Sequence, residues 1–189
     1  MANKEDIRII NNFISKKQQQ KGLSILSKFE LQPWKDNATV KIVPLIHIDA
    51  LAYVSVISQK VIKKISKEFG LTKELFCQET QMGTWDIGEG SGKHVDNLGA
   101  EFVNYSSIAY LSDNYEGGEI EFPEYEIKYK PLAGDLIIFP CDNVVHEVYP
   151  VTSGQRSTVV GFYSDIKPAF WKYGSIEGQD LNYLGQFKN

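Results

Sequence analysis

Three side chains from two separate stretches of the sequence have the types and spacing of a metal site. His94 and Asp96 lie two positions apart, and His146 lies within the run Val144-Val145-His146-Glu147-Val148. Residues two apart in a β-strand point to the same face, so the imidazole and the carboxylate converge on one point. Strand alternation also turns His146 away from its apolar neighbours. We therefore predict that these three residues bind one metal ion.

The chemistry of such a site follows from its ligands. Two histidines and one carboxylate on one face of a metal form the facial triad of non-heme Fe(II) oxygenases, which leaves the opposite positions open. A 2-oxo acid can chelate through its 1-carboxylate and keto oxygen and still leave one position for dioxygen. A His-x-Asp pair alone is a weak signal, and its order with a distal histidine and arginine makes it fairly specific.

Arg156 supplies the second half of this prediction. It lies ten residues after His146, where we expect a following antiparallel strand to return beside the first. A guanidinium binds a carboxylate through two parallel hydrogen bonds, which a lysine cannot do, so Arg156 suits the distal carboxylate of 2-oxoglutarate. Thr158 shares its face and can add a hydroxyl donor. The alternative is an ion pair of Arg156 with Asp142 or Glu147.

The elements that position these residues are expected as helices first and strands afterwards. Ser15 and Gln18 resemble a capping box that opens a helix through about Phe29, and Asp49 is expected to cap a second helix over about 50–69. From residue 75 onward, β-branched and aromatic residues punctuated by glycines predict an antiparallel barrel or jelly roll. The expected strands are 77–87, 93–96, 104–112, 119–122, 126–129, 135–139, 144–149 and 156–164.

Length and composition favour one α+β domain. A chain of 189 residues with 42% hydrophobic residues can bury one core. We expect residues 1–75 as a helical support region, 76–166 as the core and 167–189 as an ordered C-terminal extension. The net charge of -4 disfavours nucleic acid as a partner. Two cysteines without a CxxC pair, no signal peptide and no apolar run of membrane-spanning length predict a soluble, cytoplasmic protein.

These residues resemble the prolyl 4-hydroxylase group of 2-oxoglutarate oxygenases, and most closely the oxygen-sensing prolyl hydroxylase domains. The similarity covers about residues 78–164. Its motifs, in the order of that family, are Gly90-Ser91-Gly92-Lys93-His94-Val95-Asp96-Asn97, Ile108-Ala109-Tyr110-Leu111-Ser112, Gly117-Gly118, Phe122-Pro123, and His146-Glu147-Val148-Tyr149-Pro150 followed by Arg156. The resemblance implies a double-stranded β-helix core, that is a jelly roll, braced by the N-terminal helices.

The resemblance also implies cofactors and further site residues. Fe(II), 2-oxoglutarate and O2 are implied, with ascorbate as an optional addition, and the implied reaction hydroxylates a prolyl residue of a peptide or protein with release of succinate and CO2. Tyr110 matches the tyrosine that contacts the distal carboxylate beside the arginine. Trp85 stands where the family has a tyrosine near the cosubstrate. An indole N–H donates but cannot accept, so the pocket is expected to differ there.

Simpler explanations and other functions stay open at this point. His94 and Asp96 can be a surface pair, His146 a core histidine, and Tyr110, Trp85 and Thr158 packing residues. The same chemistry on a free amino acid or small metabolite is the main alternative. An alkylated nucleic acid is disfavoured because the second arginine used for that purpose would fall at Phe162. A cupin-like domain without oxygenase activity, or a zinc hydrolase, would leave Arg156 without a purpose. The sequence contains no signal for oligomeric state.

Overall fold

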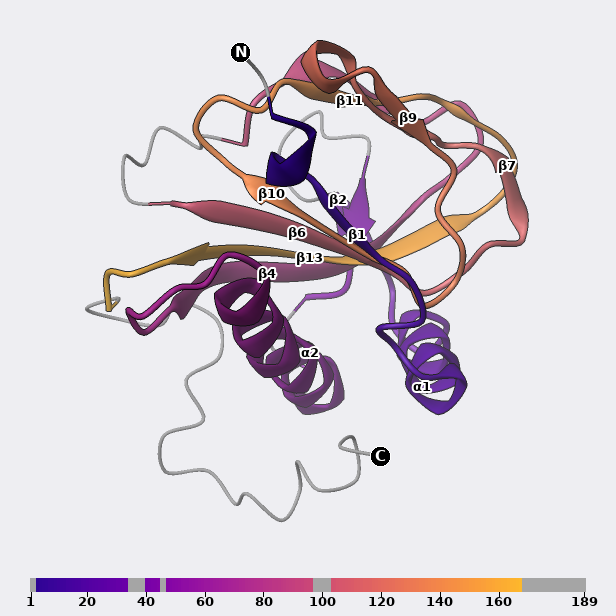
Figure 1. Ribbon diagram of the computed structural model, residues 1–189. Helices are drawn as coiled ribbons and strands as arrows, with labels where there is room; N and C mark the ends of the chain where they lie inside the picture. The colour runs from indigo at the N-terminus through magenta and orange to yellow at the C-terminus, as the bar shows by residue number, and fades with distance from the viewer. Residues whose placement is uncertain (1–2, 34–39, 45–46, 97–102, 168–189) are drawn as a thin grey trace.

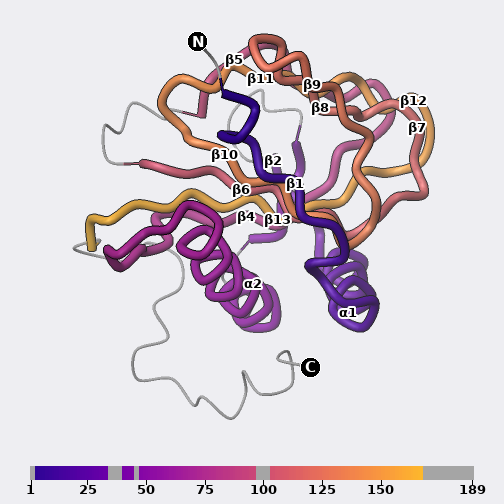
Figure 2. The backbone as a smooth tube through the Cα atoms, in the orientation of Figure 1, coloured from indigo at the N-terminus to yellow at the C-terminus, as the bar shows by residue number. Residues whose placement is uncertain are grey.

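Two antiparallel sheets face each other in the computed structural model, and two helices cover the outer face of the larger sheet (Figures 1 and 2). The structure describes residues 3–33, 40–44, 47–96 and 103–167. The expected C-terminal extension, apart from residue 167, lies outside these residues, as does Asn97 of the glycine-rich motif. Sheets stacked in this way bury a core of side chains between them.

The larger sheet, called here the major sheet, contains seven strands among the described residues. Every neighbouring pair in it is antiparallel. Its order is β1 (Arg8–Ile10), β10 (Leu136–Pro140), β6 (Tyr105–Tyr110), β13 (Arg156–Ser164), β4 (Phe76–Trp85), β3 (Lys41–Ile42) and β2 (Gln32–Pro33). The two longest strands, β13 and β4, lie side by side at its centre, so they form the rigid base of the fold.

The smaller sheet, called here the minor sheet, contains four strands among the described residues. Its order is β5 (Ser91–His94), β11 (His146–Val148), β8 (Ile120–Phe122) and β9 (Ile127–Tyr129). A separate two-stranded ribbon, β12 (Val151–Gly154) with β7 (Tyr115–Gly117), closes one end of the space between the sheets. Two short 3-10 helices, Lys4–Asp6 and Pro123–Tyr125, complete the described elements.

The two helices begin for different reasons. Helix α1 (Lys16–Leu26) starts at the predicted capping box, in which the Ser15 hydroxyl accepts from the Gln18 backbone and the Gln18 side chain accepts from the Ser15 backbone. Helix α2 (Ile48–Glu68) starts two residues earlier than expected, with His47 at the N-cap and no side-chain cap. The prediction that Asp49 caps this helix is therefore wrong. Asp49 lies in the first turn, where its charge suits the helix N-terminus.

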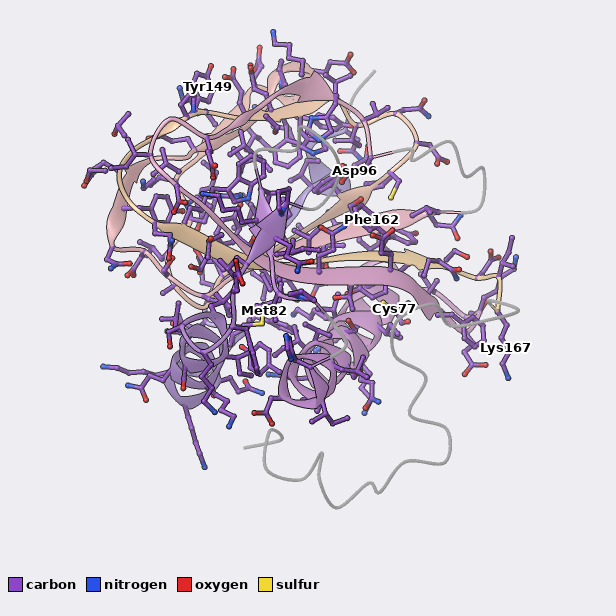
Figure 3. All side chains as sticks on the ribbon, turned by 180° about the vertical axis from the view of Figure 1, so that it is seen from behind. Cys77, Met82, Asp96, Tyr149, Phe162 and Lys167 are labelled. Carbon is purple, nitrogen blue, oxygen red and sulfur yellow. The ribbon has the colours of Figure 1, made fainter. Side chains whose placement is uncertain are left out.

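The major sheet separates two apolar cores. On the outer side, buried residues of α1 and α2 such as Ile25, Val54 and Ile57 pack against Met82 and Val159 of the sheet. The inner core between the sheets is formed by Ile108, Tyr110, Ile120, Phe122, Ile137, Phe139, Val144 and Val148. Figure 3 labels Met82 and Cys77 on the helix side, and Asp96 on the side of the minor sheet.

The α+β class and the jelly-roll core with bracing helices are confirmed, and each expected strand from 77 to 164 has a counterpart in the structure. The description of residues 1–75 as purely helical is incomplete, because β1 and β3 from this region pair with β10 and β4. Strands β7 and β12 were also not predicted. All these segments are too short for an alternating apolar pattern to appear. Among the described residues, no helix is long and apolar enough to cross a membrane.

Candidate metal centre and anion pocket

The metal-ligand candidates come together at the edge of the minor sheet. His94 ends β5, His146 begins β11, and the two are direct partners in the antiparallel register. Asp96 lies two residues beyond the end of β5, whereas the sequence predicted a strand over 93–96. The two-residue spacing still brings Asp96 back to the two imidazoles. We call His94, Asp96 and His146 the metal cluster.

The distances within the metal cluster fit a shared cation. The Asp96 Oδ1 atom lies 3.5 Å from Nε2 of His94 and 3.6 Å from Nε2 of His146. One ligand atom from each residue lies within 4.8 Å of the other two. Ligands about 2 Å from a common ion stand at such mutual separations. Among the described residues, this is the one group of His, Cys, Asp and Glu side chains with that geometry.

Backbone carbonyls orient both imidazoles. Nδ1 of His94 lies 2.8 Å from the Gly92 carbonyl oxygen, and Nδ1 of His146 lies 3.1 Å from that of Val144. An imidazole that donates through Nδ1 carries its free lone pair on Nε2. Both Nε2 atoms face Asp96, so the local backbone presents two nitrogen ligands and one oxygen ligand to the same point.

The surroundings of the metal cluster are unequal. The His146 side chain is 3% exposed and lies against the rings of Phe122 and Phe139, and this burial lowers its pKa. The His94 side chain is 41% exposed, and its contact with Asp96 raises its pKa. The inner core therefore covers the His146 side of the metal cluster, and the His94 side is open to solvent.

Asp96 stays ionised in spite of its burial. Burial by itself would raise its pKa, but His94, His146 and a hydrogen bond from Ser106 together hold that pKa below its usual value. The Ser106 hydroxyl, which is fully buried, also lies 2.9 Å from the Cys141 sulfur. A polar chain from Cys141 through Ser106 therefore supports the carboxylate, and sequence analysis did not detect it.

Arg156 lies in the major sheet, across the enclosed space from the minor sheet that carries His146. The expectation that its strand returns beside that of His146 is wrong, because β12 intervenes and β13 pairs with β4 and β6 instead. The guanidinium nevertheless points into the space between the sheets. Its Nη2 atom donates to the Tyr110 hydroxyl at 3.0 Å, and Tyr110 belongs to the same inner core that touches His146.

The charge of Arg156 has no acidic partner. The residue is 1% exposed, and no carboxylate of the described residues lies within ion-pair distance of it. Glu147, one of the two alternative partners, instead lies 3.9 Å from Lys93. A buried guanidinium without an anion is costly, so this position is suited to a ligand carboxylate.

Trp85 and Thr158, the other two residues assigned to the cosubstrate, lie beside Arg156. Trp85 is the direct partner of Arg156 in the β13–β4 register, and the guanidinium carbon lies 5.6 Å from the centre of its ring. Thr158 is buried and pairs with Tyr110 on the neighbouring strand. Together with Arg156 and Tyr110 they form what we call the anion pocket. Tyr115 of β7 also reaches this pocket, although no motif marked it in the sequence.

A surface cavity of about 500 Å³ lies elsewhere, at the end of the major sheet near the C-terminus of α2. Its lining includes Lys73, Tyr105 and Asp142 but no residue of the metal cluster or the anion pocket. The chemical groups therefore lie between the sheets and not in this open cavity.

Comparison with known proteins shows which proteins share this fold and this arrangement of residues. Residues 80–164 match the model of the 2OG-Fe(II) oxygenase superfamily. A PKHD-type hydroxylase of Maricaulis maris is 36% identical over 81 residues, which cover 40% of this chain and 36% of that protein. The chain spans between 36% and 53% of the length of the first three curated relatives.

Solved structures agree with this assignment at the level of the fold. An oxidoreductase of the 2OG-Fe(II) oxygenase family from Burkholderia pseudomallei has a TM-score of 0.74 at 15% identity, with 90% of this chain and 89% of that chain covered. A prolyl hydroxylase of Trichoplax adhaerens, in complex with a hypoxia inducible factor peptide fragment, has a TM-score of 0.66 at 19% identity, with 85% and 84% covered. Residues 80–164 of this chain are therefore similar to the 2OG-Fe(II) oxygenase superfamily, and the resemblance to prolyl hydroxylases is confirmed.

Proposed function

We propose that the chain is an Fe(II)- and 2-oxoglutarate-dependent dioxygenase that hydroxylates a prolyl residue in a peptide or protein and releases succinate and CO2. One observation carries the proposal: two imidazoles and a carboxylate converge beside the inner core that also contains Tyr110, the hydrogen-bond partner of a buried guanidinium that has no acidic partner. The first group suits Fe(II) and the second suits a distal carboxylate, which is the pair of requirements that 2-oxoglutarate chemistry makes.

In this proposal His94, Asp96 and His146 hold the iron, which supplies the activation of dioxygen when it is bound. The residues fit this task without rearrangement of the backbone, because the Nδ1 contacts to Gly92 and Val144 already direct both Nε2 atoms toward Asp96. Arg156 binds the distal carboxylate of 2-oxoglutarate, Tyr110 supports it, and Trp85 and Thr158 line the same pocket.

The substrate enters, in our proposal, from the side of His94. This imidazole is the most exposed ligand of the metal cluster, and the adjacent Val95 is an exposed apolar residue. The Trichoplax adhaerens enzyme, which shares the fold, was solved with a peptide fragment bound. An open, partly apolar approach of this kind suits a segment of polypeptide.

The direct test is turnover of 2-oxoglutarate by the purified chain with Fe(II), ascorbate and oxygen. We expect succinate formation that depends on iron, and a peptide product that gains one oxygen atom on a prolyl residue in mass spectrometry. His146→Ala should lose this activity. The matched control is His47→Ala, because His47 lies outside the metal cluster, stacked on Phe29. A fully metallated chain that never consumes 2-oxoglutarate would contradict the proposal.

Two other candidates give different results in the same experiment. Action on a free amino acid or small metabolite would consume 2-oxoglutarate without peptide oxidation, and a panel of such substrates would then identify the target. A cupin-like or zinc-hydrolase domain would bind metal but give no visible absorption band when 2-oxoglutarate is added to the Fe(II) protein without oxygen. Activity on alkylated nucleic acid is disfavoured, because Phe162 is buried with Val103 and Cys141 and offers no second cation.

The proposed setting is a reducing compartment such as the cytoplasm. The two cysteines, Cys77 and Cys141, are both buried, and neither forms a disulfide. Burial raises the pKa of each thiol to about 12, which keeps both of them neutral and unreactive.

A further inference from the structure

Two buried polar atoms close to each other in the anion pocket have no hydrogen-bond partner. They are the hydroxyl oxygen of Tyr115 and Nε of Arg156. The two residues are 3% and 1% exposed, so neither atom reaches bulk water. Buried polar groups in folded proteins are nearly always paired, and an exception at a binding site suggests that the missing partner is a ligand.

Gly118 explains how Tyr115 and Arg156 come close together. A Cβ atom at this position would meet Cε2 of Tyr115 at 2.9 Å and Cδ of Arg156 at 3.1 Å. The backbone of Gly118 also has a φ of +64°, which favours glycine. The bare backbone therefore lets the tyrosine ring and the arginine side chain pack against the same point.

Independent contacts hold the Tyr115 ring in place. In the β12–β7 ribbon, Tyr115 pairs with Gly154, and Gly154 lies two residues before Arg156 in the sequence. The Lys130 ammonium lies 3.8 Å from the centre of the ring and donates to the Tyr115 carbonyl at 2.9 Å. These contacts hold both the backbone of Tyr115 and one face of its ring. The fold therefore fixes the position of the hydroxyl in the pocket.

The hydroxyl of Tyr115 is a donor at neutral pH. Burial raises its pKa well above the ordinary value, and the adjacent Arg156 guanidinium, which approaches the hydroxyl without reaching hydrogen-bond geometry, offsets this only in part. The Tyr110 hydroxyl accepts from Nη2 of Arg156, so its own proton is also free to be donated. The pocket therefore presents two phenolic O–H groups and an unused guanidinium N–H, three donors without an acceptor.

We propose that Tyr115 is a further cosubstrate-binding residue, which donates a hydrogen bond to the distal carboxylate of 2-oxoglutarate together with Arg156 and Tyr110. This inference rests on the proposed function. A carboxylate has about four lone-pair sites, so one anion can accept from all three donors. The consequence is selectivity: a 2-oxo acid without the distal carboxylate leaves the three donors unpaired and gains nothing from Tyr115.

The test compares Tyr115→Phe with Tyr53→Phe. Tyr53 is equally buried, but it lies in α2 on the other side of the major sheet, where its hydroxyl donates to the Gln18 carbonyl at 2.9 Å. Calorimetric titration of the Fe(II) proteins without oxygen would measure the Kd for 2-oxoglutarate and for 2-oxopentanoate, which has the same carbon chain without the distal carboxylate.

We expect Tyr115→Phe to raise the Kd for 2-oxoglutarate about tenfold, the lower end of the effect of a hydrogen bond to a charged group. The Kd for 2-oxopentanoate should not change, and Tyr53→Phe should change neither. Without ligand, Tyr115→Phe should unfold at the wild-type temperature or slightly above it, because it removes an unpaired buried group. Tyr53→Phe should unfold earlier, because it removes a hydrogen bond that is made.

Three results would overturn the inference. The first is an unchanged Kd for 2-oxoglutarate in Tyr115→Phe, and the second is an equal loss of affinity for both acids, which would indicate a general distortion. The third is a large loss of stability in the ligand-free variant, which would mean that the hydroxyl already has a partner. Failure of the wild-type protein itself to bind 2-oxoglutarate would overturn the proposed function as well, so the two failures are distinguishable.

Discussion

The metal cluster and the anion pocket share the space between the two sheets, but they are built in different ways. The metal cluster lies at the edge of the minor sheet, on the short strands β5 and β11, with His94 41% exposed. The anion pocket lies on the central strands β13 and β6 of the major sheet, with Arg156 and Tyr110 almost fully buried. Under the proposed function, this contrast is a division of tasks, with an enclosed base that would hold the cosubstrate and an open edge where substrate would meet the iron.

The largest expected effect comes from removing the central ligand of the open edge. Asp96→Ala takes away the carboxylate that lies within 3.6 Å of both imidazole Nε2 atoms. Two histidines alone do not complete a facial triad, so we expect turnover to fall to the background rate and Fe(II) binding to be lost in metal analysis. The control is Asp142→Ala, since Asp142 is exposed and lies outside the metal cluster. Normal iron content in Asp96→Ala would show that the carboxylate is not a ligand.

The next effect tests the enclosed base. Arg156→Met removes the buried guanidinium while filling much of its volume, and we expect the KM for 2-oxoglutarate to rise about 10- to 100-fold, from the loss of charge-assisted hydrogen bonds. Iron binding should be retained, which separates this variant from Asp96→Ala. Arg156→Lys keeps the charge but not the paired N–H groups, so it should fall between Arg156→Met and wild type.

The control for Arg156 is Arg8→Met. Arg8 is a partly buried arginine of β1 that packs over Phe69 and lies 4.0 Å from Glu68, away from the site. Its loss should leave the KM for 2-oxoglutarate unchanged. Equal KM values for Arg156→Met and wild type would mean that the cosubstrate's far end binds elsewhere, and the proposed division between base and edge would fail.

The same contrast explains what sequence could predict. The spacing of His94 and Asp96 fixed their convergence although Asp96 lies outside the strand, because two residues of extended chain suffice to bring both side chains to one side. Arg156 was assigned through its family motif and its chemistry, but the strand beside it was predicted wrongly. Strand pairing depends on contacts far apart in the sequence, and a ten-residue interval does not reveal that β12 intervenes.

Residues whose role depends only on their position in the folded sheet could not be identified from the sequence. Tyr115 is one of ten tyrosines, and only the ribbon that carries it shows that its hydroxyl reaches Arg156. Ser106 and Ser107 are adjacent and identical in type, yet they point to opposite faces of β6. The register of β6 against β10 and β13 decides which of them supports the metal cluster, and this register is a property of the folded sheet.

The smallest effect uses that pair of serines to sharpen the comparison. Ser106 contacts Asp96 and Cys141 on the inner face, whereas the Ser107 hydroxyl donates to Tyr163 at 3.3 Å on the helix side. Groups that hydrogen-bond a metal ligand typically change metal affinity by about 10- to 100-fold, so Ser106→Ala should weaken Fe(II) binding by about tenfold. Its turnover at saturating iron should stay close to wild type, because all three ligands remain.

Ser107→Ala provides the matched control on the other face of the same strand. It should lower the free energy of unfolding by about 1 kcal/mol, the usual contribution of one hydrogen bond, and leave the iron affinity unchanged. Titration of both variants with Fe(II) in the absence of oxygen, combined with thermal unfolding, separates the two effects. If the two variants lost iron affinity equally, the hydroxyl of Ser106 would have no specific role at Asp96. The two faces of the major sheet would then not be independent, and a defect in helix packing would reach the iron.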